Sequence, residues 1–252
     1  MEIEIVKKML SKVGYVGGDG FFCSGGSISN LYGMFLARHN FNNTIKSDGN
    51  ICNLIGYVSD HAHYSFTKNA NLMGIGENNI IKISTINGKM DIVDLENNIK
   101  HKRPFFVNAT IGTTVLGSFD DIVEIHHICK KYDIKLVSDS CHALGAKFQD
   151  SEGNWQKVGN CRYADISIFS FHPVKHITCG EGGMMTFKNK EQFEKASLLR
   201  SHGITKKQDD FQAQPHGGWY YEMQELGYNY RLSDISCALG QSQLGKIESF
   251  LN

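Results

Sequence analysis

The sequence has 252 residues, of which 41% are hydrophobic, so the chain is long enough to bury the core of one large domain. Its 26 lysines and arginines equal its 26 aspartates and glutamates, and a formal net charge of zero offers no basic field to attract nucleic acid or anionic membranes. We therefore expect a small-molecule substrate, with neither a nucleic acid nor a membrane as partner.

Targeting and metal signals are weak. The first residues, MEIEI, lack the basic and apolar regions of a secretory signal, and no apolar run reaches the length of a membrane span. The seven cysteines are scattered without a Cys-x-x-Cys pair, which is typical of reduced thiols. His126 and His127 are neighbours on an expected helix, where adjacent side chains diverge, so no metal site is predicted. These features predict a cytoplasmic protein.

Helix and strand signals alternate along most of the chain. In chain order, we expect a helix at residues 27–40, a strand at 53–60, a helix at 64–74, a strand at 79–84, a helix at 90–102, a strand at 105–110, a helix at 119–133, a strand at 135–139, a polar insertion at 148–163, strands at 166–171 and 183–187, and helices at 190–201 and 231–251. Such a βαβ series predicts an α/β fold with a central, mostly parallel sheet and helices on both faces.

Polar residues cluster at the predicted strand ends, where loops and helix N-termini of an α/β sheet bind ligands. A Gly-rich turn opens the first expected helix, and single polar residues follow the later strands. These residues are Ser24, Gly25, Gly26, Ser27, His63, Thr110, Asp139, Ser170 and Lys175.

Three chemical features of this set match one cofactor. A Gly-rich turn at a helix N-terminus suits a phosphate, a carboxylate at a strand end suits a buried cation, and a lysine beside it suits an aldehyde. Pyridoxal phosphate carries a phosphate, a pyridinium nitrogen and an aldehyde that condenses with a lysine amine. The sequence therefore predicts pyridoxal 5′-phosphate as cofactor.

The second half of the chain resembles a known family. Its motifs are DSCHALGA (139–146), SFHPVK (170–175), GEGG (180–183), RSHG (200–203), GYNYR (227–231) and ALG (238–240). In this order they resemble the DegT-type nucleotide-sugar aminotransferases, and within that family the transaminases of pseudaminic acid synthesis. The resemblance covers residues 120–252.

The first half resembles a different family. The motifs GFFCSGGSISN (20–30), HAHYS (61–65) and NATIGTTVLG (108–117) are similar to those of the group II decarboxylases that act on glutamate and cysteine sulfinate. Both families share the fold type I scaffold of pyridoxal-phosphate enzymes. The two resemblances predict one cofactor-binding large domain at residues 1–252, decarboxylase-like over 1–118 and sugar-aminotransferase-like over 119–252, without the C-terminal small domain of the aminotransferases.

The resemblances imply a role for each residue. Lys175 would condense with the cofactor aldehyde and then move the proton as general acid and base, and Asp139 would keep the ring nitrogen protonated. His63 would stack on the ring face, and the Gly-rich turn with Ser170 would bind the phosphate. Thr110 and His142 would lie near the ring. Asn229 would reach the phosphate of a partner subunit, which implies a homodimer.

Plainer interpretations remain beside these roles: a surface lysine, an aspartate that caps a turn, a loop histidine at position 63 and a turn asparagine at position 229. Three functions stay open. The leading one is a nucleotide-sugar aminotransferase that uses glutamate as amino donor, as the Lys175 segment implies. The second is a glutamate-type amino-acid decarboxylase, as the His63 and Thr110 segments imply. The third is a hybrid without turnover, because a missing small domain leaves nothing to close over the substrate.

Overall fold

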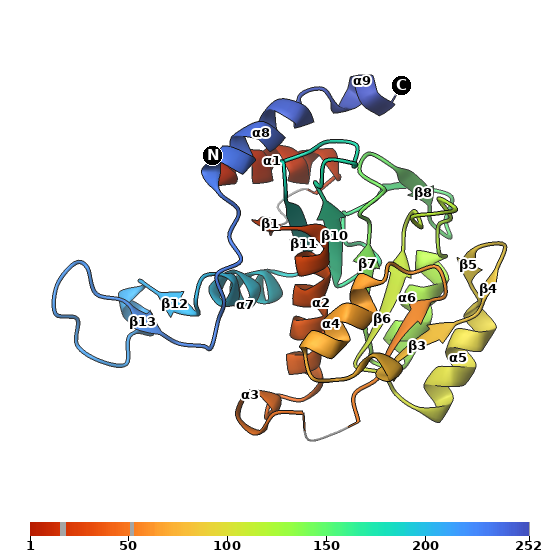
Figure 1. The fold of residues 1–252 in the computed structure, drawn as a ribbon, viewed down its shortest axis with the longest axis horizontal. Coiled ribbons are helices and arrows are strands. Elements are labelled where there is room, and N and C mark those ends of the chain that lie inside the picture. The colour runs from red at the N-terminus through yellow and green to blue at the C-terminus, as the bar shows by residue number, and fades with distance from the viewer. Residues whose placement is uncertain (16–18, 51–52, 252) are drawn as a thin grey trace.

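A seven-stranded sheet with the order β1-β11-β10-β7-β6-β2-β3 forms the centre of the computed structural model, which describes residues 1–15, 19–50 and 53–251 (Figure 1). Its strands are β1 (Asp19–Cys23), β2 (Gly56–Ser59), β3 (Ile80–Ile83), β6 (Phe106–Thr110), β7 (Lys135–Asp139), β10 (Ile166–Ser170) and β11 (Gly183–Phe187). The pairs from β10 to β3 are parallel, whereas β11 runs antiparallel to both β10 and β1. The sheet is therefore mostly parallel, as predicted.

Both faces of the sheet are apolar, because successive residues of a strand point to opposite faces. On β1, Phe21 and Phe22 are both buried but belong to different hydrophobic clusters, and Met185 and Met184 on β11 divide in the same way. A sheet with two apolar faces needs helices on both sides.

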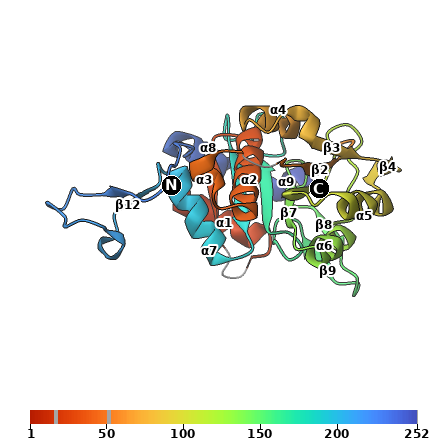
Figure 2. The same ribbon diagram turned by 90° about the horizontal axis from the view of Figure 1, so that it is seen from below.

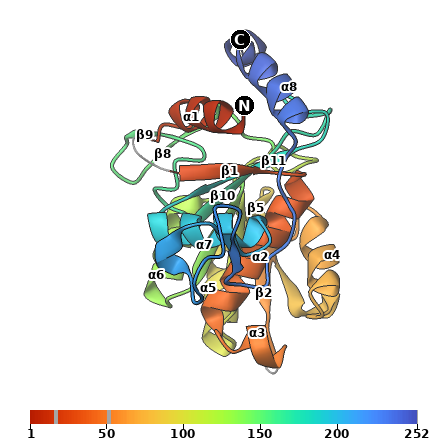
Figure 3. The same cartoon turned by 90° about the vertical axis from the view of Figure 1, so that its left-hand side faces the viewer.

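Three helices cover one face: α2 (Gly26–Phe41), α4 (Ser65–Leu72) and α7 (Lys190–Arg200), which all contribute to one hydrophobic cluster with the strands. The other face is divided between two pairs of helices, α5 (Ile92–His101) with α6 (Ile122–Lys131), and α1 (Glu2–Lys12) with α8 (Asp234–Leu244). Figure 2 shows α2 at the centre of the molecule, and Figure 3 shows α1 and α8 on the opposite side of β1 from α2. The predicted α/β architecture with helices on both faces is confirmed.

Short elements complete the chain. They are α3 (Ile45–Asp48), α9 (Ile247–Leu251), two 3-10 turns at Glu77–Asn79 and Gln208–Asp210, and three two-stranded hairpins formed by β4 (Thr85–Ile86) with β5 (Lys89–Met90), β8 (Lys147–Gln149) with β9 (Trp155–Lys157), and β12 (Ile204–Thr205) with β13 (Glu222–Met223). The β12–β13 hairpin projects away from the body of the domain (Figures 1 and 2). Over the described ranges, no helix is both long and apolar enough to span a bilayer.

The expected helix at residues 231–251 is wrong in its extent. The structure begins α8 at Asp234, because the Ser233 side chain caps the helix by accepting a hydrogen bond from the Ser236 backbone N–H at 3.2 Å. It also ends α8 at Leu244, with Gly245 as the C-cap, and starts α9 at Ile247. The polar insertion at residues 148–163 contains part of the β8–β9 hairpin, and the sequence pattern indicated neither α1 nor β1.

Candidate active site

Six strands of the sheet end at the same edge, and the predicted site residues lie at or just after the ends of five of them, β1, β2, β6, β7 and β10. A cavity of about 530 Å3 opens at this edge, within the range of small-molecule sites. Every residue of the predicted site except Asn229 lines it: Ser24, Gly25, Gly26, Ser27, His63, Thr110, Asp139, His142, Ser170 and Lys175. Segments as distant in sequence as residues 24 and 175 are therefore brought together.

One end of the cavity is the N-terminus of α2. Gly25 is the N-cap of this helix, and no side chain within the described ranges caps it. The first backbone N–H groups of a helix have no intrahelical acceptor and favour an anion. Gly26 allows a close approach to the end of β10, since a Cβ at this position would lie 2.7 Å from Ser170 Cβ and 2.9 Å from Ser170 Oγ. The Ser170 hydroxyl therefore lies directly beside the start of α2.

Lys175 lies in the turn that follows β10. Its backbone N–H donates to the His172 carbonyl at 2.9 Å, and the turn returns toward β11 through Gly180, whose φ of +82° favours glycine. Lys175 Nζ is 2.5 Å from His142 Nε2. Burial lowers the pKa of Lys175, although Cys141 and Asp139 act in the opposite direction. Partial burial thus favours the neutral amine, the form that reacts with an aldehyde.

Asp139 is the last residue of β7, and its side chain is buried, with 3% exposure. Each carboxylate oxygen accepts one hydrogen bond: Oδ2 from the Asn30 amide at 3.0 Å, and Oδ1 from the Cys141 backbone N–H at 3.1 Å. A buried carboxylate held in this way can bind a cation that enters the cavity.

Two histidines face the same cavity. His63 and His142 are both partly buried, and burial lowers the pKa of each. The lowered pKa values favour neutral imidazole rings near neutral pH. Thr110, at the end of β6, is fixed by its backbone N–H, which donates to the buried Asp120 carboxylate at 2.7 Å.

Asn229 does not reach the cavity of its own chain. It is exposed and lies in a segment whose backbone is bound to the end of α7, where the Tyr230 N–H donates to the Arg200 carbonyl at 3.1 Å. The same segment pairs Asn229 with Ser201 in an isolated bridge. The side chain is therefore available to another molecule.

Several residues that line the cavity were absent from the sequence prediction: Ile28, Asn30, Tyr64, Gly112, Thr114, Cys141, His172, Val174 and Glu181. A sequence signal existed for Asn30, because it follows Ser27 by three residues and so lies on the same face of α2. In the turn that contains Lys175, His172 Nε2 lies 3.8 Å from Glu181 Oε1.

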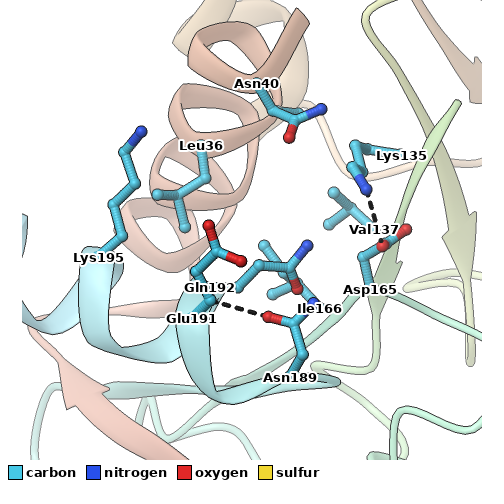
Figure 4. Close-up of a pocket in the computed structure, with 11 residues that line it drawn as sticks. Leu36, Asn40, Lys135, Val137, Asp165, Ile166, Asn189, Glu191, Gln192 and Lys195 are labelled. Carbon is cyan, nitrogen blue, oxygen red and sulfur yellow. Dashed lines mark hydrogen bonds and ion pairs between the residues drawn. The ribbon is translucent and has the colours of Figure 1, made fainter.

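A second cavity, of about 230 Å3, lies at the opposite edge of the sheet (Figure 4). It is lined by the end of α2, the starts of β7 and β10, and the start of α7, and it contains an ion pair of 3.4 Å between Lys135 and Asp165. Ligands of parallel α/β sheets bind at the carboxyl ends of the strands. This second cavity therefore lies at the wrong edge for the active site.

Comparison with known proteins identifies the family of the chain. The sequence profile of the DegT/DnrJ/EryC1/StrS aminotransferase family matches residues 55–252. The chain belongs to this family. The match begins well before residue 120, so the family's pattern extends into the half of the chain that also resembles decarboxylases.

Individual relatives come from both expected groups. The chain is 42% identical over 185 residues to a UDP-4-amino-4,6-dideoxy-N-acetyl-beta-L-altrosamine transaminase of Campylobacter jejuni, an alignment that covers 73% of this chain and 44% of that protein. It is also 42% identical over 154 residues to a glutamate decarboxylase of Drosophila melanogaster, covering 58% of this chain and 30% of that protein. The chain thus spans less than half the length of these relatives.

Solved structures of both groups, sugar aminotransferases and decarboxylases, are similar to this chain. Helicobacter pylori PseC, an aminotransferase involved in the biosynthesis of pseudoaminic acid, matches with a TM-score of 0.76 and 26% identity, covering 98% of this chain and 58% of that one. Mouse CSAD in its apo form matches with a TM-score of 0.70 and 27% identity, covering 99% of this chain and 51% of that one. The fold type I prediction and the resemblance to both families are confirmed.

Proposed function

We propose that this chain binds pyridoxal phosphate and acts as an aminotransferase that converts a nucleotide-linked keto sugar to an amino sugar, with glutamate as amino donor. One observation carries the proposal: a partly buried lysine, Lys175, and a buried carboxylate, Asp139, line one cavity with an uncapped helix N-terminus. Membership of the aminotransferase family and the likeness to the Campylobacter transaminase favour the sugar substrate.

The residues of the cavity fit the cofactor group by group. The start of α2 offers N–H groups to a phosphate, and Gly26 leaves room there for the hydroxyl of Ser170. Asp139 offers a fixed anion to a ring nitrogen, and Lys175 offers an amine of lowered pKa to an aldehyde. Pyridoxal phosphate, when bound, supplies the aldehyde and a ring that withdraws electrons from the reacting carbon.

The chain's own groups then move and hold protons. Lys175 Nζ would move the proton between the substrate carbon and the cofactor, because burial lowers the pKa of this amine and so favours its neutral, basic form. The Asp139 carboxylate would hold the proton of the ring nitrogen. His63 would pack against the ring face. His142 lies next to Lys175 Nζ and would orient it by a hydrogen bond.

We infer that the working unit is a homodimer in which Asn229 contributes to the partner's phosphate site. The exposed position of Asn229 outside its own cavity supports this arrangement. So do the large exposed apolar and aromatic side chains of the projecting segment, of the chain after it and of α8, namely Trp219, Tyr221, Leu226, Tyr228 and Ile235.

A second candidate function, decarboxylation of a glutamate-type amino acid, is favoured by one observation. His63, in the segment that resembles the decarboxylases, lines the cavity beside Lys175 and Asp139. The likeness to the Drosophila glutamate decarboxylase also supports it.

A single incubation distinguishes the candidates. Purified protein is loaded with pyridoxal phosphate and given L-glutamate, while the absorbance spectrum and released carbon dioxide are followed. A stoichiometric conversion of the cofactor to pyridoxamine phosphate, without carbon dioxide, is the expected result. Release of carbon dioxide would favour decarboxylation, and loaded protein that shows neither change would favour the hybrid without turnover.

A further inference from the structure

Asn30, a buried polar side chain without an assigned role, contacts Asp139. It lies on α2 and is only 1% exposed. Its amide nitrogen donates to Asp139 Oδ2 at 3.0 Å, and its Oδ1 is buried without a hydrogen-bond partner among the described residues. An unpaired amide oxygen in the interior lowers the free energy of unfolding. The side chain is therefore destabilising unless the hydrogen bonds that its NH2 group donates compensate.

The orientation of the Asn30 amide follows from its neighbours. An ionised carboxylate only accepts hydrogen bonds, so the atom that faces Asp139 Oδ2 has to be the NH2 group. The same nitrogen is 3.0 Å from the hydroxyl oxygen of Ser65. The two protons of one amide therefore serve Asp139 and Ser65.

Ser65 continues the chain of hydrogen bonds to His63. Because Ser65 Oγ accepts from Asn30, its own proton is free for His63 Nδ1, which lies 2.8 Å away. The backbone N–H of Ser65 also donates to Nδ1, at 3.2 Å. With two donors directed at Nδ1, the neutral His63 ring has to carry its proton on Nε2.

We propose that Asn30 is a positioning residue: its amide holds the Asp139 carboxylate in the orientation that meets the cofactor's ring nitrogen and, through Ser65, fixes the tautomer of His63. This inference rests on the proposed function, because it assigns Asp139 and His63 to the cofactor ring. The Cys141 N–H binds the other carboxylate oxygen, so rotation of the Asp139 side chain would break both hydrogen bonds.

The test compares two ligands that differ only at the ring nitrogen. Dissociation constants are measured for pyridoxal phosphate and for its benzaldehyde analogue, in which a carbon atom replaces that nitrogen. The variant Asn30→Leu keeps the side-chain volume and removes the amide. Asn108→Leu is the matched control. Asn108 is also fully buried, and its Oδ1 has no hydrogen-bond partner among the described residues. Its amide donates to the Thr110 hydroxyl at 3.0 Å and does not contact Asp139.

We expect the unmodified protein to prefer pyridoxal phosphate over the analogue. Asn30→Leu should weaken binding of pyridoxal phosphate by about tenfold or more, the usual effect of losing a hydrogen bond to a charged group, and leave binding of the analogue unchanged. Asn108→Leu should preserve the preference. Equal weakening of both ligands by Asn30→Leu would show that Asn30 is only structural. An unmodified protein that binds neither ligand would instead overturn the proposed function, and this inference with it.

The chain of hydrogen bonds from Asn30 through Ser65 to His63, called the relay here, can be tested in the cofactor-free protein with Asn30 unchanged. In cofactor-free protein labelled with 15N-histidine, the His63 signals, identified by their loss in His63→Gln, should show a protonated Nε2 and an unprotonated Nδ1. A proton on Nδ1 at neutral pH would overturn the relay, because Ser65 could then not donate to that atom.

Discussion

The two edges of the central sheet each place a lysine near an aspartate, but in different surroundings. At the amino edge, Lys135 forms an ion pair with Asp165, and Asp165 also accepts the backbone N–H of Leu136 at 3.0 Å. At the carboxyl edge, Lys175 is partly buried beside His142, and none of the ion pairs within the described ranges includes it. A lysine paired with a carboxylate stays charged, whereas burial without such a pair favours the neutral, reactive amine.

The largest expected effect is at Lys175. Lys175→Ala should abolish the visible absorbance that appears when pyridoxal phosphate condenses with the protein, because the amine that forms the bond is gone. Lys135→Ala, at the other edge of the sheet, is the matched control and should retain that absorbance. Circular dichroism checks that both variants fold. Unchanged absorbance in Lys175→Ala would show that Lys175 is not the lysine that condenses with the cofactor.

The next effect concerns the two aspartates. Asp139→Asn removes the anion that faces the cavity, and the rate of the half-reaction with glutamate should fall on the order of a hundredfold, as for loss of other preorganised charges in active sites. Asp165→Asn should lower the melting temperature without changing this rate. Stopped-flow absorbance measures both. A rate for Asp139→Asn within about threefold of the parent, equivalent to about 0.7 kcal/mol of barrier, would reduce Asp139 to a structural role.

A smaller effect is expected at Asn229. Asn229→Ala should weaken cofactor binding by about tenfold, since one hydrogen bond to a charged phosphate is lost across the dimer. When Asn229→Ala subunits are mixed with Lys175→Ala subunits, cofactor binding should recover, because one site of the mixed dimer has both Lys175 and the partner's Asn229. Fluorescence titration of the mixture measures this recovery. A monomer by light scattering that binds the cofactor tightly contradicts the shared site.

The smallest effect is a pH dependence at the carboxyl edge. Burial lowers the pKa of His63 and of His142 in the folded protein, so the unfolded chain takes up protons first as the pH falls through about 6.5. The free energy of unfolding of the cofactor-free protein should therefore be largest above this pH and decrease below it. Urea titrations at several pH values should show a shallower decrease in the double variant His63→Gln, His142→Gln. An equal decrease in both proteins would place the titrating groups elsewhere.

Much of the active-site edge was predictable from sequence, because it depends on local patterns. The strands that carry Asp139 and Ser170 are short segments with Leu, Val, Ile and Phe at their centres, and polar residues at the carboxyl ends of such strands lie at the edge of the sheet. The helical spacing from Ser27 places Asn30 on the side of α2 that faces the cavity, but its contact with Asp139 was not predictable, because its partners, Ser65 and Asp139, come from distant segments. The hairpin of β12 and β13 was missed for a different reason: strands of two residues are too short to show alternation.

The pairing of β1 with β11 sets an order of events during synthesis. Cys23, which directly precedes the Gly-rich turn at the start of α2, is opposite Gly183 in the sheet, so the two strands are separated by about 160 residues of chain. The β1 strand leaves the ribosome long before its partner exists. The end of the cavity at the start of α2 can thus form only after residue 187 has emerged, and until then β1, with Phe21 and Phe22, is an unpaired apolar strand that a chaperone could bind.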